Sequence, residues 1–167
     1  DFDRQITGNV IYYDNEFNNF VIISKEQKLE SEVLVFADAG LTSVNADALK
    51  QLAVNCLRDG VGMAGGRILS DKGTLLFGRM ECDKDGKLYF ADAGLQKGFT
   101  GYFHKAILQQ NTEGVSYKFF AVRKELFEAW QPSEFETSEK AMEAFCSFVK
   151  DSGYRISYVP EATAILK

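Results

Sequence analysis

A single acidic side chain, Asp38, occupies a position where the sequence could place chemistry at the edge of a sheet. It follows the unbroken apolar run of residues 33–36, which is typical of a strand with both faces covered. Gly40 then marks a turn, and Asn45 can cap a helix that follows it. In open α/β sheets, ligands bind at the carboxyl ends of strands, so Asp38 is a candidate ligand contact. The alternative is ordinary turn chemistry, in which the aspartate only serves the loop between strand and helix.

Other residue types that often perform chemistry are sparse. Cys56, Cys82 and Cys146 lie far apart in the sequence, which is typical of reduced thiols in a cytosolic protein and not of a disulfide frame or a zinc site. Cys56 and Cys146 fall among apolar helix positions, which favours a place in the core. The one histidine, His104, lies among aromatic residues and is more typical of a packed or surface residue than of a catalyst. The glycine-rich residues 62–66 lack the spacing of a phosphate loop, so we discount them.

The composition is that of a globular protein, with 167 residues of which 46% are hydrophobic and 26% are charged. A chain of this length forms one domain most simply, so we expect a single domain over residues 1–167. A net charge of −5 without a cluster of Lys and Arg argues against nucleic-acid binding. No apolar run approaches the roughly 18 residues of a membrane span, and no signal peptide opens the chain. We therefore expect a cytoplasmic protein, and the missing initiator Met indicates a fragment or the C-terminal part of a longer chain.

The elements that would position Asp38 alternate along the chain. The expected strands cover residues 9–13, 33–36, 115–122 and 154–159, the last of them ended by Pro160. The expected helices cover residues 17–28, 46–57 and 123–129, followed by a helix capped by Thr137 or Ser138 and stopped by Gly153. From residue 61 onward, glycines separate short apolar segments, which is typical of antiparallel hairpins. Together these predict an α/β fold with a mixed, mostly parallel sheet flanked by helices and a hairpin-rich antiparallel middle.

Four segments covering nearly the whole chain carry motifs in a recognisable order: residues 33–52, 60–78, 101–128 and 153–162. The first reads VLVFADAGLTSVNADALKQL and the second GVGMAGGRILSDKGTLLFG; the third ends in AVRKELFE, and the fourth is GYRISYVPEA. In this order they resemble the family 2 glycosyltransferases, particularly the bacterial members that build cell-surface polysaccharides. The second and fourth segments are similar to that family's "G-x-V-G-G-x-I" and "G-Y-R-I-x-Y-x-P-x-A" motifs.

The resemblance implies an α/β fold of the GT-A type and inverting transfer of a sugar from a nucleotide-sugar donor to a glycan acceptor. It also implies a divalent metal, Mn²⁺ or Mg²⁺, because the diphosphate leaving group develops charge that a carboxylate-bound metal can stabilise. A separate carboxylate would take the proton from the acceptor hydroxyl. By resemblance, Asp38 is the residue that would contact the metal or the diphosphate.

The chain departs from the family at both acidic motifs. The family's metal motif presents two acids around one residue, whereas here Asp38 stands alone. The family's base is an acid at the head of the penultimate helix, and alignment through that helix places Ala141 and Met142 at the paired acids. By resemblance, Glu136 and Glu139, in the preceding loop and the first helical turn, are then the candidate bases.

Two alternatives apply to the acids around this helix. Glu139 is equally well explained by stabilisation of the helix dipole. Glu143 lies opposite the apolar face of the helix, so we expect it on a solvated surface.

The nucleotide side of the family's site is incomplete in this chain. In the family, the first two β-α units hold the nucleoside, and the strand over residues 9–13 corresponds to a later strand. Asp14 follows that strand and is the position where a nucleotide-side contact would fall. Its alternative role is again that of a turn residue.

Two functional hypotheses follow. In the first, the chain belongs to an enzyme that transfers sugar in cell-surface polysaccharide synthesis, with Asp38 on metal or diphosphate and Glu136 or Glu139 as base. In the second, it is a glycosyltransferase-like module that has lost the chemistry and binds or scaffolds. The single acid at each motif favours the second hypothesis for these residues alone.

Overall fold

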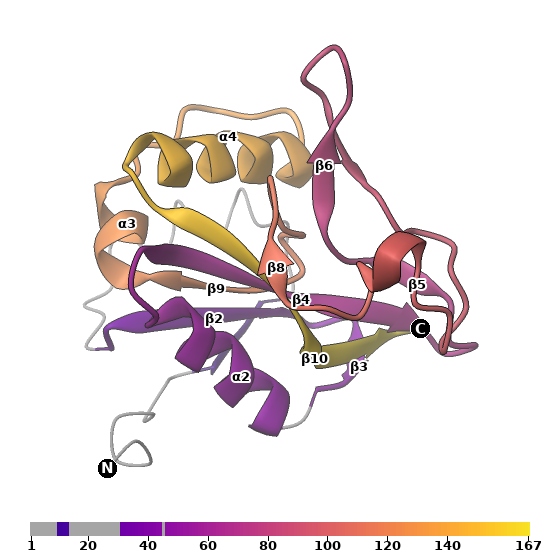
Figure 1. Ribbon diagram of the computed structural model, residues 1–167. Coiled ribbons are helices and arrows are strands. Elements are labelled where there is room, and N and C mark those ends of the chain that lie inside the picture. Colours follow the sequence, from indigo (N-terminus) through magenta and orange to yellow (C-terminus); the bar gives the residue numbers. More distant parts are fainter. Residues whose placement is uncertain (1–9, 14–30, 45) are drawn as a thin grey trace.

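The computed structural model describes residues 10–13, 31–44 and 46–167, the first of these ranges by its backbone alone (Figure 1). The strands are β1 (Val10–Tyr13), β2 (Val33–Asp38), β3 (Leu41–Ser43), β4 (Val61–Ser70), β5 (Leu75–Phe77), β6 (Met80–Cys82), β7 (Leu88–Phe90), β8 (Gln110–Asn111), β9 (Phe119–Arg123) and β10 (Arg155–Leu166). The helices are α2 (Ala46–Cys56), the 3-10 helix η2 (Tyr102–His104), α3 (Lys124–Ala129) and α4 (Ser138–Asp151). The predicted helix over residues 17–28 and the cap at Asn45 lie outside the described residues. Within the described ranges, no helix has the length and apolar character needed to cross a membrane.

Eight of the described strands form one sheet, in which antiparallel pairs outnumber parallel ones. The order is β1-β2-β9-β4-β10-β3, with β5 added to β4 and β8 added to β10. Only the pairs β1–β2 and β4–β10 are parallel. The predicted mixed α/β architecture is therefore confirmed, but the mostly parallel sheet is wrong. The reason is β9, which inserts between β2 and β4 and runs against both of them.

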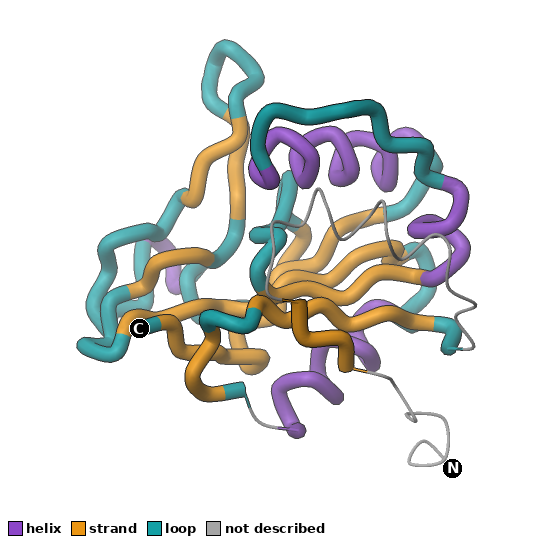
Figure 2. The backbone as a smooth tube through the Cα atoms, turned by 180° about the vertical axis from the view of Figure 1, so that it is seen from behind, coloured by secondary structure: helices purple, strands orange, loops and turns teal. Residues whose placement is uncertain are grey.

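Helices cover both faces of the sheet (Figures 1 and 2). Along β2, Leu34 and Phe36 pack in the core on the side of α3 and α4. The alternating positions Val33, Val35 and Ala37 pack in a second core on the side of α2. Because side chains alternate across a strand, an unbroken apolar run is needed where both faces are covered. The prediction for this strand is confirmed, and the strand carries Asp38 to its carboxyl end.

The glycine-rich residues after Val61 belong to the long central strand β4, and only the end of this strand forms the predicted antiparallel hairpin, with β5. A Cβ added to Gly65 would lie 2.2 Å from Cγ1 of Val115, and one added to Gly66 would lie 2.4 Å from Cδ1 of Phe119. These glycines therefore let neighbouring side chains pack directly on the strand backbone, which is a recognised use of glycine within strands.

Strand β10 continues through Pro160, where the sequence predicted its end. Its register against β4 shifts between Tyr158 and Thr163, so Pro160 lies in an irregular stretch of the ladder. Proline is tolerated at such irregularities because no regular backbone N–H donation is required there.

The predicted last helix is confirmed as α4. The hydroxyl of Thr137, one of the two expected caps, accepts a hydrogen bond of 3.2 Å from the backbone N–H of Lys140. Gly153 follows the helix with φ 86°, a left-handed conformation that favours glycine. The helix buries Phe145 and Cys146 against the sheet, so its position is fixed by the core and its first turn by the cap.

The predicted hairpin-rich middle is confirmed in residues 71–111, which we call the middle segment. β5 returns antiparallel along β4, and β6 and β7 pair in a separate two-stranded sheet. In Figure 1 this β6–β7 hairpin rises beside α4. The middle segment therefore places the β6–β7 hairpin next to α4, the helix that carries the candidate base Glu139.

Candidate active site

The carboxylate of Asp38 lies at the end of β2 and is held by two partners. Its Oδ1 accepts a hydrogen bond of 2.7 Å from the backbone N–H of Gly40. Its Oδ2 lies 2.8 Å from Nζ of Lys118, in an ion pair whose side chains are 21% and 20% exposed. Backbone pairing adds to this, because the N–H of Asp38 donates to the carbonyl of Lys118 at 2.8 Å. Both oxygens of the candidate ligand are therefore already engaged.

The lysine partner has a raised pKa. Partial burial alone would lower the pKa of Lys118, but its hydrogen bonds with Asp38 and Tyr117 outweigh that effect. The ammonium is thus kept charged beside Asp38, where it neutralises the negative charge that would attract a cation.

A divalent metal has a poor fit at this point in the described part of the chain. Among those residues no group of three or more His, Cys, Asp or Glu side chains is arranged to hold an ion. Asp38 contributes one carboxylate, and Lys118 already occupies it. Mg²⁺ and Mn²⁺ favour several oxygen ligands, so this aspartate alone does not make a site. Asp14, the predicted nucleotide-side contact, lies outside the described residues.

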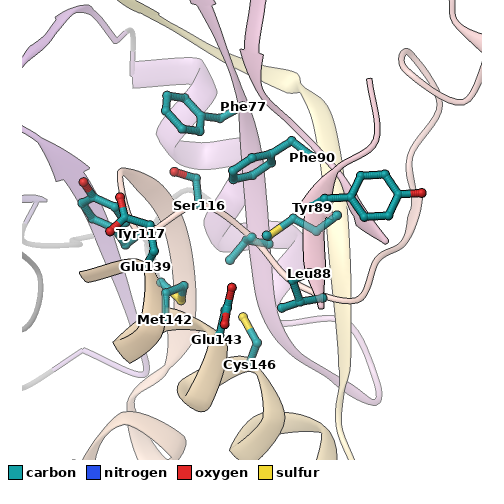
Figure 3. A pocket seen from close by; sticks show the side chains of 12 residues that line it. Phe77, Leu88, Tyr89, Phe90, Ser116, Tyr117, Glu139, Met142, Glu143 and Cys146 are labelled. Atoms are coloured by element: carbon teal, nitrogen blue, oxygen red, sulfur yellow. The ribbon is translucent and has the colours of Figure 1, made fainter. Parts of the chain in front are cut away.

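A cavity of about 140 Å³ opens next to Tyr117, the residue before Lys118 (Figure 3). We call it the edge pocket, and its lining comes from the middle segment, the loop before β9 and helix α4: Phe77, Met80, Leu88, Tyr89, Phe90, Val115, Ser116, Tyr117, Glu139, Met142, Glu143 and Cys146. Tyr117 joins the pocket to the ion pair, because Nζ of Lys118 lies 4.8 Å from the centre of its ring. The edge pocket therefore lies at the end of the sheet to which β2 delivers Asp38.

Most of the wall is apolar or aromatic. The rings of Phe77 and Phe90 meet edge to face with centres 5.1 Å apart, and Val115 and Cys146 are buried. The β6–β7 hairpin and α4 approach closely here, since a Cβ on Gly114 would lie 3.1 Å from Leu88 and 3.4 Å from Cys146. Ligand pockets are commonly lined in this way, with a few polar groups that fix orientation.

Two carboxylates supply those polar groups. Glu139, exposed in the first turn of α4, lines the edge pocket, as does Tyr117 (Figure 3). Glu143, one helical turn later, is half-buried and also lines the pocket. The expectation that Glu143 faces solvent is therefore wrong. The helical pattern alone does not predict that the β6–β7 hairpin, remote along the chain, covers this side of the helix.

Glu136, the other predicted base, is not among the lining residues of the edge pocket. Its side chain is 80% exposed and forms an ion pair with Lys140, one turn along the chain. The hydrogen bond from Lys140 lowers the pKa of Glu136. The structure thus places Glu139 at the edge pocket and leaves Glu136 outside it.

The buried cysteines are structural. Burial raises the pKa of Cys56 and of Cys146 to about 12, so both thiols stay protonated and unreactive. The prediction that they fill the core is confirmed. His104 is exposed on the middle segment and does not line the edge pocket.

No protein-family model matches this chain, and no curated protein matches it. Functional assignment therefore depends on the chemistry of the edge pocket, an aromatic cavity with two carboxylates from α4, and of the Asp38–Lys118 ion pair next to its lining residue Tyr117.

Proposed function

We propose that this chain is a glycosyltransferase family 2-like domain that transfers a sugar from a nucleotide-sugar donor to a glycan acceptor, with inversion. We place the acceptor in the edge pocket and assign the process to cytoplasmic steps of cell-surface polysaccharide synthesis. The observation that carries the proposal is the position of the pocket. An aromatic cavity with two carboxylates is linked through Tyr117 and Lys118 to Asp38 at the end of β2.

The pocket suits one end of a glycan. Aromatic faces such as that of Phe90 pack against the C–H faces of a sugar ring, and carboxylates accept hydrogen bonds from its hydroxyls. The cavity, about 140 Å³, is too small to enclose a whole nucleotide-sugar. We therefore assign it to the terminal sugar unit of the acceptor and leave the donor on the Asp38 side.

Glu139 is the carboxylate we assign as the base. It lies in the first turn of α4 and lines the edge pocket. An ionised carboxylate in reach of an acceptor hydroxyl can take its proton as the new bond forms. Glu143, half-buried one turn further along α4, would hold a neighbouring hydroxyl and orient the acceptor.

On the donor side, Lys118 places an ammonium group beside the pocket and Asp38 holds it there. A lysine so placed can neutralise charge on a leaving diphosphate. The described residues do not complete a site for Mn²⁺ or Mg²⁺, so we derive no step through a metal.

The test combines binding and transfer. The chain is titrated calorimetrically with oligosaccharides and with UDP- and dTDP-sugars, with and without Mn²⁺, and release of the nucleotide is followed in parallel. We expect Glu139→Gln to keep acceptor affinity while reducing transfer by about 10²–10⁴-fold, the usual contribution of a general base. Glu128→Gln, an exposed glutamate on α3, is the matched control and should leave both unchanged. If no saccharide or donor binds, the proposal fails.

A second function is favoured by one specific contact. The ion pair with Lys118 occupies Asp38, which suits a domain that binds glycan without transferring sugar. Such a module would give saturable oligosaccharide binding at the edge pocket, no nucleotide release with any donor, and no response to Mn²⁺.

A further inference from the structure

Large apolar side chains are exposed together in one stretch of the middle segment. Of the six large hydrophobic residues that are exposed in the described part of the chain, five lie within residues 99–108, at 39% to 75% exposure. They are Phe99, Tyr102, Phe103, Ile107 and Leu108. An exposed cluster of this kind marks an interaction surface more often than scattered single residues do. We call residues 97–108 the aromatic loop.

The backbone holds these side chains outward. Phe103 and His104 both adopt left-handed conformations, with φ 49° and 59°, which are unusual for residues other than glycine. The loop is fixed to the core at Ala106, which is 2% exposed and whose carbonyl accepts a hydrogen bond of 2.9 Å from the hydroxyl of Tyr158. Its rings are therefore presented by a tethered loop, with Tyr102 and Phe103 edge to face at 4.4 Å.

The charge of this stretch is opposite to that of the chain. Residues 93–112 contain no Asp or Glu, although the chain as a whole has a net charge of −5. Lys97, His104 and Lys105 lie within the aromatic loop. Lys105 pairs with Glu81 at 3.9 Å and lines a cavity together with Glu81 and Asp92. Exposed aromatic side chains with basic neighbours are the combination that binds the interface of an anionic membrane.

We propose that the aromatic loop docks this protein on an anionic lipid bilayer. The rings of Phe99, Tyr102 and Phe103 enter the boundary between headgroups and acyl chains, and Lys97 and Lys105 contact lipid phosphates. Aromatic rings are favoured at that depth, and each nearby lysine adds electrostatic attraction. A symmetric contact with a second copy fits less well, because it would bring two equally basic patches together.

Vesicle co-sedimentation tests this directly. The chain is mixed with vesicles of phosphatidylcholine alone or with 30% phosphatidylglycerol added, at low and at high salt. We expect binding to the anionic vesicles, little to the neutral ones, and weaker binding at high salt because salt screens the attraction. Lys97→Gln should lower the partition coefficient about fivefold, as expected for one lysine at a charged bilayer. Lys84→Gln, at the exposed tip of the β6–β7 hairpin, is the matched control and should have no effect.

The aromatic contribution is tested with Phe99→Ser combined with Phe103→Asn, since asparagine tolerates the left-handed conformation. This variant should lose binding by about tenfold or more, as expected when apolar area no longer leaves water. Its circular dichroism and thermal midpoint show whether the fold is kept. Absence of binding to anionic vesicles, equal binding to neutral ones, or binding that survives the double variant each overturn the proposal. So do loop-dependent dimers without vesicle binding. The vesicles carry no sugar, so the outcome is independent of the proposed transferase activity.

Discussion

The central sheet and the middle segment differ in how much apolar surface they bury and in what they expose to solvent. In the sheet, β2, β4 and β9 are buried on both faces and packed between α2 on one side and α3 and α4 on the other. In the middle segment, the strands are short and six large apolar side chains remain exposed. The middle segment also contains a buried ion pair, in which Arg79, with a 7% exposed side chain, lies 2.6 Å from Asp92.

The difference shows how stability and recognition are divided. The sheet gains its stability from apolar burial, which is non-directional and roughly proportional to area. The middle segment depends on an ion pair at Arg79, where burial would lower the pKa but Glu81 and Asp92 raise it more. Both the hairpin wall of the edge pocket and the aromatic loop belong to the segment. The two proposed binding surfaces are thus located on the part of the chain that buries less apolar surface.

The largest effect is expected at the junction of α4 and the sheet. The ring of Phe145 is fully buried and stacks on Trp130 with centres 4.3 Å apart. Phe145→Ala should lower the free energy of unfolding by about 3–5 kcal/mol, because it leaves a cavity in the core. Urea denaturation gives the value, and the half-buried Phe148→Ala is the control with a smaller loss. A loss below about 1 kcal/mol for Phe145→Ala would mean that this core is not packed as described.

Next comes the charged anchor of the middle segment. Asp92→Asn should cost about 2 kcal/mol, since it leaves the buried Arg79 with Glu81 alone. We expect the loss to be local: hydrogen exchange should rise in residues 71–111 while β4 and β10 stay protected. Asp71→Asn, at an exposed turn, is the control. Uniform loss of protection throughout the sheet would contradict the division between the two regions.

A smaller effect is expected at the start of α4, which carries Glu139. Thr137→Ala removes the side chain that accepts the hydrogen bond from Lys140 N–H and should destabilise the protein by about 1 kcal/mol. Ser147→Ala, exposed on the same helix, should cost less. Thermal unfolding compares the two, and equal midpoints would show that the cap does not hold the helix.

The smallest effect concerns the thiols. Cys82, exposed on the hairpin, should react with Ellman's reagent at pH 8, while Cys56 and Cys146 in the two cores should react only after unfolding. Burial raises the pKa of both thiols in the folded protein from 9.0 to about 12. The contribution of the protonated thiols to the free energy of unfolding is therefore fully present below pH 9. It should be lost progressively as the pH rises from about 9 to 12, since the unfolded thiols ionise first. Three fast-reacting thiols in the folded protein would contradict the packing of both cores.

Local sequence patterns predicted the elements that local physics determines. The apolar run before Asp38 identified β2, and Thr137 with the periodic apolar face identified α4. The length of strand β4 was not predicted, because its glycines are required by close contacts with side chains distant in sequence, those of Val115 and Phe119. Rules based on local propensity or turn types cannot predict such long-range contacts.

The site shows the same limit. Glu139 was predicted by resemblance and lines the edge pocket, whereas Glu143 was assigned to solvent because only the helix itself was considered. Lys118, the partner of Asp38, lies 80 residues away in sequence, so no spacing rule connects the two. The sequence shows that Lys118 follows Tyr117 in a strand-like stretch, but it does not show that Lys118 pairs with Asp38.

The central claim is that the edge pocket beside Asp38 receives the end of a glycan. The direct measurement is a titration of the ¹⁵N-labelled chain with oligosaccharides, followed through its amide chemical shifts. We predict saturable shifts concentrated at Phe90, Ser116, Tyr117 and Glu143, reduced in a Phe90→Ala variant that remains folded. Shifts that fall elsewhere, or no saturable shift with any oligosaccharide, would contradict the account.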